Sequence, residues 1–215
     1  MQLILFDCDG VLVDSEPIST RVLSAVLAEI GLSLGEVATE QQFMGRSRAE
    51  SVALIEQQLG RSVPEGFVPR WQSRVFEAFR QELKPVPGIH AALDRLRVPY
   101  CLASGSDPAR IRLSLELTGL LPRFDGRIFS ATQVARGKPA PDLFLFAAHS
   151  LGAAPNQCVV VEDTVLGVQA AVAAGMRVLG YAARNPASSL AQAGAITLDD
   201  MAHLPELIER LATPA

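Results

Sequence analysis

The segment QLILFDCDGVLVDS, residues 2–15, carries the strongest indication of fold class in this chain. Its first five residues form an almost wholly apolar run, typical of a strand buried on both faces of a parallel sheet, and the run stops at Asp7. Asp7 and Asp9 therefore follow the C-terminal end of a strand, where open α/β sheets place their ligand crevice. Gly10 allows the chain to turn away sharply. The segment predicts a parallel α/β sheet with two carboxylates at its ligand-binding edge.

Three further apolar runs occur along the chain, at residues 98–103, 158–161 and 177–181. Each is followed by polar or glycine residues and then by a helical pattern, so the chain alternates between strand and helix. This alternation predicts the α/β class, with a doubly wound, mainly parallel, Rossmann-like sheet. Residues 15–83 interrupt the alternation, because they contain no convincing strand and three amphipathic helical patterns, at 18–30, 48–59 and 67–83.

The interruption indicates two structural parts. We expect a core made of residues 1–14 and 84–215, and a small all-helical cap domain made of residues 15–83, which lies above the C-terminal edge of the sheet.

Composition excludes several classes of protein. With 215 residues, 49% of them hydrophobic, the chain can bury a large core, and a net charge of −4 gives no basic surface for nucleic acid or anionic lipid. Its longest apolar runs fall short of the roughly 18 residues that a membrane span needs. The three cysteines are odd in number and form no CxxC, so we expect reduced, buried thiols. We therefore expect a cytoplasmic protein that binds neither nucleic acid nor membrane. A monomer is a separate expectation that composition does not decide.

Acidic residues recur at a second strand end. The repulsion between Asp7 and Asp9 needs compensation, which a divalent cation would supply, and oxygen ligands with few histidines or cysteines nearby favour Mg²⁺. The alternative is an acidic turn that only caps the strand end. The run at 158–161 ends in Glu162 and Asp163 before the next helix begins. Asp163 is therefore either a further metal ligand or the N-cap of that helix.

Two more junctions carry groups suited to phosphate. Ser104, Gly105 and Ser106 follow the strand at 98–103, so a hydroxyl and backbone amides meet at a helix N-terminus, as in a phosphate cradle or an ordinary turn. Lys138 lies in a proline-stiffened loop, where it could neutralise a phosphoryl group or be a solvated surface lysine. We expect these four junctions to face the same crevice.

Four segments in chain order resemble the motifs of haloacid dehalogenase superfamily phosphatases that carry a helical cap after the first strand: DCDGVLVDS, ASGS, GKPAPDLF and VVVEDTVLGVQAA. The resemblance covers almost the whole chain and is closest to the sugar-phosphate phosphatase and β-phosphoglucomutase-like type. It implies a Mg²⁺-dependent phosphoric monoester hydrolase that forms an aspartyl-phosphate intermediate. In this scheme Asp7 is the nucleophile, and Asp9 protonates the leaving group and later activates water.

The resemblance also assigns ligands. Mg²⁺ would be held by the Asp7 carboxylate, the Asp9 backbone carbonyl and Asp163, with Glu162 in the outer shell. The phosphoryl oxygens would be bound by three groups, namely Ser104, the Gly105 amide and Lys138.

Substrate choice is assigned to the cap. The loop at residues 43–48 resembles the cap loop that faces the active site, so Gly45 and Arg48 are expected to contact substrate, with Arg46 as the alternative to Arg48. Where β-phosphoglucomutase has a cap histidine and a Lys-Asn pair, this chain has Ser19 and Asp107-Pro108. We therefore favour hydrolysis of a small organic phosphomonoester, such as 6-phosphogluconate or 2-deoxyglucose 6-phosphate. A hexose-phosphate mutase is the alternative, and a non-catalytic phospho-acceptor is a more remote one.

Overall fold

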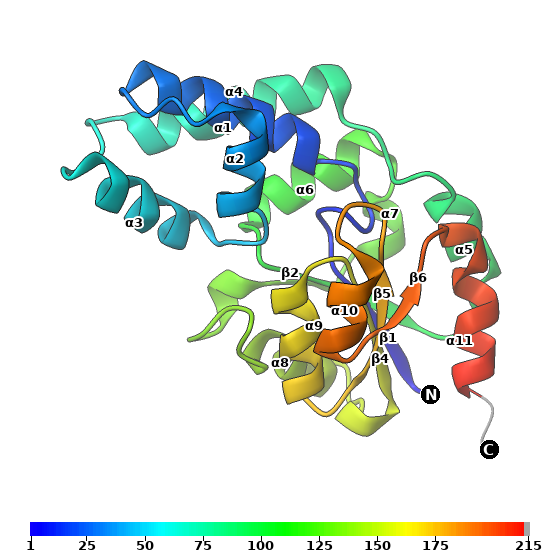
Figure 1. Cartoon of the computed structure of the whole chain (residues 1–215). Helices are drawn as coiled ribbons and strands as arrows, with labels where there is room; N and C mark the ends of the chain where they lie inside the picture. Colours follow the sequence, from blue (N-terminus) through cyan, green and yellow to red (C-terminus); the bar gives the residue numbers. More distant parts are fainter. Residues whose placement is uncertain (213–215) are drawn as a thin grey trace.

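The sheet is the centre of the molecule. A computed structural model describes residues 1–212, and residues 213–215, the end of the expected core, lie outside the described part. Within the described part, six strands form one sheet in the order β3-β2-β1-β4-β5-β6, and every neighbouring pair is parallel (Figure 1). The strands are β1 (Leu3–Phe6), β2 (Tyr100–Ser104), β3 (Ile128–Ser130), β4 (Cys158–Glu162), β5 (Arg177–Tyr181) and β6 (Ile196–Leu198). The expected doubly wound parallel α/β fold is confirmed.

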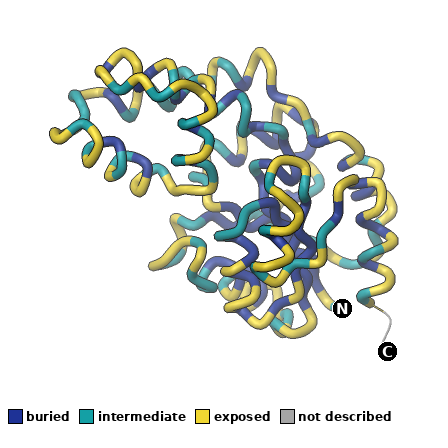
Figure 2. The backbone as a smooth tube through the Cα atoms, in the orientation of Figure 1, coloured by how far each residue is buried: buried dark blue, intermediate teal, exposed yellow. Residues whose placement is uncertain are grey.

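Helices cover both faces of the sheet because β1 is apolar on both. Ile4 and Phe6 pack into one hydrophobic cluster, and Leu3 and Leu5 into the other, as the two-residue repeat of a strand requires. The first cluster includes residues of α5 (Ile89–Arg95), α6 (Pro108–Leu117), α7 (Leu121–Phe124) and α11 (Leu204–Ala212). The second includes residues of α8 (Asp142–Ser150), α9 (Val165–Ala173) and α10 (Ala187–Ala193). The strands accordingly follow the buried interior of the molecule in Figure 2.

The remaining four helices form a separate layer, named here the α1–α4 layer. They are α1 (Glu16–Glu29), α2 (Gly35–Phe43), α3 (Arg48–Leu59) and α4 (Phe67–Glu82), and Figure 1 shows them to one side of the sheet. The layer has a hydrophobic cluster of its own, which includes Leu27, Phe43, Ile55 and Phe67. Three of these helices match the expected patterns, whereas α2 was not expected, because only Thr39 and Phe43 of its nine residues are buried.

The structure departs from the sequence-based expectation mainly in short elements. The edge strands β3 and β6 have three residues each, too few to give a recognisable apolar run. The three cysteines are free and buried, as expected. Burial, together with the negative charge of Asp9, raises the pKa of the Cys8 thiol well above its ordinary value. In the described part of the chain, no helix is both long enough and apolar enough to cross a membrane.

Candidate active site

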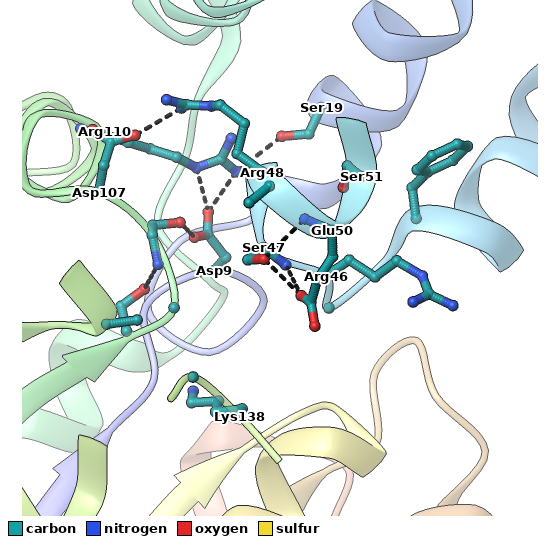
Figure 3. A pocket seen from close by; sticks show the side chains of 18 of the residues that line it. Asp9, Ser19, Arg46, Ser47, Arg48, Glu50, Ser51, Asp107, Arg110 and Lys138 are labelled. Carbon is teal, nitrogen blue, oxygen red and sulfur yellow. Dashed lines mark hydrogen bonds and ion pairs between the residues drawn. The ribbon is translucent and has the colours of Figure 1, made fainter. Parts of the chain in front are cut away.

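A cavity of about 870 Å³ lies between the C-terminal edge of the sheet and the α1–α4 layer. Its core side is lined by residues that follow β1, β2 and β4 and by the loop before α8, and its opposite side by residues of α1, α3 and α4 (Figure 3). Among the lining residues are the expected site residues Asp7, Asp9, Gly45, Arg48, Ser104, Gly105 and Lys138. Asp163 is absent from this lining because it is buried behind it, 2% exposed.

Lys138 joins two of the acidic strand ends. Its Nζ lies 2.6 Å from Asp7 Oδ1 and 2.6 Å from Glu162 Oε1, and the side chain is 9% exposed. Burial alone would lower the pKa of Lys138, but the two carboxylates outweigh it and raise the pKa above its ordinary value. Burial raises the pKa of Asp7, and the charge of Lys138 opposes that rise. The interpretation of Lys138 as a solvated surface lysine is therefore wrong.

Glu162 organises the turn from β4 into α9. While one of its oxygens accepts from Lys138, Oε2 accepts from the backbone amides of Asp163 and Thr164, each at 2.8 Å. A Cβ atom at Gly167 would lie 1.8 Å from Glu162 Oε1, so this helical position must be glycine. The resemblance implied that Glu162 lies in the outer shell of a metal. The structure shows in addition that Glu162 accepts a hydrogen bond from Lys138.

Asp163 is the unpaired member of this group. The N-cap of α9 is Thr164, whose Oγ1 accepts from the amide of Gly167 at 3.1 Å, so the capping interpretation of Asp163 is wrong. Both carboxylate oxygens of Asp163 are buried and lack a hydrogen-bond partner. Burial, reinforced by the charges of Glu162 and Asp7, raises the pKa of Asp163 well above its ordinary value.

The surroundings of Asp163 fit a cation. A buried carboxylate without a partner is costly unless a positive charge compensates it. A Cβ at Gly10 would lie 2.1 Å from Asp163 Oδ2, so the loop after β1 approaches this carboxylate through a residue that has no side chain. Within residues 1–212, no group of three or more His, Cys, Asp or Glu side chains is arranged to hold a metal. The expected Mg²⁺ ligands would not form such a group, because they are only two side chains, those of Asp7 and Asp163, together with the backbone carbonyl of Asp9.

Asp9 belongs to a different network from Asp7. Its Oδ1 accepts from Arg110 Nη2 at 2.7 Å, Arg110 Nε at 3.2 Å and Ser15 Oγ at 2.5 Å, and its Oδ2 accepts from Ser106 Oγ at 2.6 Å. Figure 3 shows the Asp9 carboxylate directed toward Arg110, with Lys138 apart from it. Burial alone would raise the pKa of Asp9, but the charge and hydrogen bonds of Arg110 outweigh it and lower the pKa below its ordinary value.

Arg110 was missed in the sequence. One signal could have found it: it lies in the first turn of α6, where the helix dipole disfavours a cation, so another group must compensate its charge.

The expected phosphate-binding turn is intact. Ser104 ends β2 and is buried, and its Oγ accepts from the amide of Ser106 at 3.1 Å, which leaves the hydroxyl hydrogen for another acceptor. Ser130 Oγ donates to the carbonyl oxygen of Ser106 at 2.7 Å and fixes the turn from the neighbouring strand. Gly105 is exposed between the two serines and faces the cavity.

The expected cap residues lie on the opposite wall. Arg48 Nη2 lies 2.7 Å from Asp107 Oδ2, so this arginine reaches from α3 to the residue that caps α6. Arg46 instead donates to the carbonyl oxygen of Gln42 in its own layer, at 2.7 Å. A Cβ at Gly45 would lie 3.4 Å from Thr164, so the loop before α3 is close to the start of α9.

Trp71 has two roles. Its ring packs against Phe67, with centroids 6.2 Å apart, inside the α1–α4 layer. It also lines the cavity, and its buried Nε1 has no hydrogen-bond partner.

Comparison with known proteins agrees with this arrangement. A family model described as haloacid dehalogenase-like hydrolase matches residues 1–175. The chain is 27% identical to the 6-phosphogluconate phosphatase of Escherichia coli K12 over 208 residues, which cover 96% of this chain and 94% of that protein. It is 30% identical to a phosphorylated carbohydrates phosphatase of Thermotoga maritima, over 92% of this chain and 94% of that one.

A solved structure is similar over the full length. The crystal structure of a conserved haloacid dehalogenase-like protein from Agrobacterium tumefaciens matches with a TM-score of 0.85 and 35% identity, over 99% of this chain and 100% of that one. The sheet and the helical layer are therefore common to both proteins.

Proposed function

This chain belongs to the haloacid dehalogenase-like hydrolase family, and we propose that it hydrolyses a small sugar phosphate through an aspartyl-phosphate intermediate on Asp7. The observation that carries the proposal is the Asp7–Lys138 pair at the C-terminal edge of the sheet, in the same cavity as Asp9 and Ser104. The expectations of this family and of a hydrolase are confirmed, and the substrate class is supported by the relatives that act on phosphorylated carbohydrates.

Asp163 supports a Mg²⁺ site within this proposal. Its two buried oxygens lack partners, and with Asp7 and the backbone carbonyl of Asp9 it would hold the cation. When bound, Mg²⁺ would supply positive charge that offsets the carboxylates and the phosphoryl oxygens.

In the first half-reaction, a carboxylate oxygen of Asp7 attacks phosphorus and the bond from phosphorus to the sugar oxygen breaks. The Asp9 carboxyl, whose pKa Arg110 lowers, must first take up a proton; it then gives this proton to the sugar oxygen, so the product leaves as a neutral alcohol. Lys138 and the Ser104 hydroxyl stabilise charge on the transferring phosphoryl group, because both lie at the cavity wall beside Asp7.

In the second half-reaction, the Asp9 carboxylate takes a proton from water as the water oxygen bonds to phosphorus. The bond from phosphorus to Asp7 breaks, which restores the Asp7 carboxylate and releases inorganic phosphate. The sum of the two steps is hydrolysis of one phosphate ester, and Asp9 ends with the proton that it gave away in the first.

We further propose that the α1–α4 layer, within residues 15–83, is the cap domain that selects the substrate. Arg48 supports this role, since its guanidinium lines the cavity at the boundary with the core. A monomeric state, a cytoplasmic location and the absence of nucleic-acid or membrane partners stay predictions.

The decisive experiment combines turnover with trapping. Purified protein with Mg²⁺ is assayed for phosphate release from a panel of sugar phosphates, and the acid-quenched enzyme is examined by mass spectrometry for one added phosphoryl group. We expect Asp7→Asn to lose both the phosphoryl group and at least ~10³-fold in kcat. Asp199→Asn is the matched control, because that side chain is 89% exposed, outside the site.

Two results would contradict the proposal. Wild-type turnover in a folded Asp7→Asn variant would exclude Asp7 as the nucleophile. An isomeric sugar phosphate in place of free phosphate, seen by phosphorus NMR, would identify the mutase alternative.

A further inference from the structure

Arg110 is the cation that contacts Asp9, the proposed acid and base. Its Nε and Nη2 both donate to Asp9 Oδ1, and its side chain is 16% exposed. We infer that Arg110 is a positioning residue for Asp9, which fixes the orientation in which the Asp9 carboxyl exchanges protons. This inference rests on the proposed function, because it concerns how Asp9 performs the two proton transfers.

Arg110 is held by three parts of the fold. Its backbone lies in the first turn of α6, where its amide donates to the capping residue Asp107 at 3.0 Å. The guanidinium lies 4.8 Å from the centroid of the Phe79 ring in α4, and Nη2 also donates to Ser19 Oγ of α1 at 3.0 Å. The arginine is therefore fixed by the core and by the α1–α4 layer together, and has little freedom to turn away from Asp9.

The hydrogen-bond pattern explains why Asp9 depends on this residue. Two of the four side-chain hydrogen bonds that Asp9 accepts come from Arg110, and the others come from the hydroxyls of Ser15 and Ser106. Without Arg110, a carboxylate that is 13% exposed would keep two neutral donors and no counter-ion. It would then sample other rotamers, and a misplacement of about 1 Å at a reacting group can cost ~10²-fold in rate.

Arg110 thus differs from a residue that binds phosphate directly. If it acts through Asp9, its removal should lower kcat and leave KM nearly unchanged. The effect should also vanish when Asp9 can no longer transfer protons.

The test is a double-mutant cycle on kcat with Arg110→Met and Asp9→Asn, on the best sugar phosphate with Mg²⁺. We expect Arg110→Met to lower kcat by ~10²-fold, with KM within about threefold of the wild-type value. In the Asp9→Asn background, the same substitution should change kcat by less than about threefold. Arg112→Met is the matched control on α6, because the Arg112 side chain is 67% exposed and forms its ion pair with Glu116 on the same helix.

A second variant covers the case in which Arg110→Met does not fold. Arg110→Lys keeps a positive charge beside Asp9 and removes the contact by two nitrogens from one guanidinium. We expect it to lower kcat at least ~10-fold, again only when Asp9 is present. Multiplicative losses in the double variant, a raised KM as the main effect, or a loss below about threefold would overturn the inference.

A readout without catalysis separates this inference from the proposed function. Crystal structures of the wild type and of Arg110→Lys, without substrate, should show the Asp9 carboxylate displaced from Ser15 and Ser106 in the variant. An unmoved Asp9 would overturn the inference even if the enzyme is a phosphatase. Absence of phosphatase activity in the wild type would instead contradict the proposed function, and the position of Asp9 in the two structures would still decide the role of Arg110.

Discussion

Replacement of Lys138 by methionine tests the charge balance of the site most directly. The variant keeps an unbranched apolar side chain and removes the ammonium group, whose nitrogen lies 2.6 Å from both Asp7 and Glu162 and 4.9 Å from the centroid of the Phe144 ring. Removal of one partner from a buried ion pair costs about 3–5 kcal/mol, because the remaining charge is left uncompensated. We therefore expect the free energy of unfolding at pH 8, with EDTA present, to fall by about that amount.

The loss should depend on pH with a definite sign. Burial already raises the folded-state pKa of Asp7 to about 7, above the ordinary value of 3.8. Without Lys138, the folded-state pKa of Asp7 should rise further, so the folded variant binds a proton at Asp7 more tightly than the unfolded chain does. Stability of the variant should then decrease as pH rises from the unfolded-state pKa to the folded-state pKa, and the deficit at pH 5 should be smaller than at pH 8.

Urea unfolding followed by circular dichroism at pH 5 and pH 8 measures both quantities. Lys84→Met is the matched control, because Lys84 is exposed. The free energy of unfolding of this variant should stay within about 0.5 kcal/mol of the wild-type value. With Mg²⁺ and substrate, Lys138→Met should lose ~10²-fold or more in kcat/KM. A stability loss below about 1 kcal/mol at pH 8, an equal deficit at both pH values, or a kinetic loss below about threefold would refute this account of Lys138.

Two further predictions concern Asp163 and Arg48. Asp163→Asn should raise the melting temperature in EDTA, and by more at pH 8 than at pH 5, because it removes a buried carboxylate whose folded-state pKa is raised. The same variant should lower the Mg²⁺-dependent kcat/KM at least ~10-fold. A lower melting temperature of the variant at pH 8 would contradict this prediction. Arg48→Ala should lower kcat/KM for the best sugar phosphate by ~30-fold to 10³-fold and change kcat/KM for p-nitrophenyl phosphate little. Arg70→Ala is the control, because Arg70 is exposed in the α1–α4 layer and does not line the cavity, and equal losses on both compounds would show that Arg48 acts on phosphate or on cap position.

Sequence alone was sufficient for the main architecture. The apolar run before Asp7 is β1, and the run before Glu162 is β4, which pairs with β1 in parallel. Both could be predicted because a strand buried on two faces must be apolar at every position, a property that is local in sequence. The helix starts at Ser47 and Asp107 are local in the same way, since a cap contacts amides within three residues of itself.

Local sequence patterns also located the side chains of the site, but not the residues with which they form hydrogen bonds and ion pairs. The sequence indicated that Asp7, Asp9, Ser104 and Lys138 would meet at one edge, because the C-terminal ends of parallel strands share that edge. It left two interpretations of Asp163 open, since an acidic residue before a helix is equally suited to a cap and to a ligand. Only the folded turn shows that Thr164 makes the cap and that Asp163 has no partner.

The pairing of charges across the site needed the tertiary structure. Arg110 and Asp9 are 101 positions apart in the chain, and Lys138 and Asp7 are 131 apart. They meet because β1 lies between β2 and β4 in the sheet and because α1 and α4 pack against α6 and hold the Arg110 side chain. An arginine or lysine carries no local periodicity that indicates its distant partner, so which cation compensates which carboxylate is set by strand order and by the packing of the α1–α4 layer.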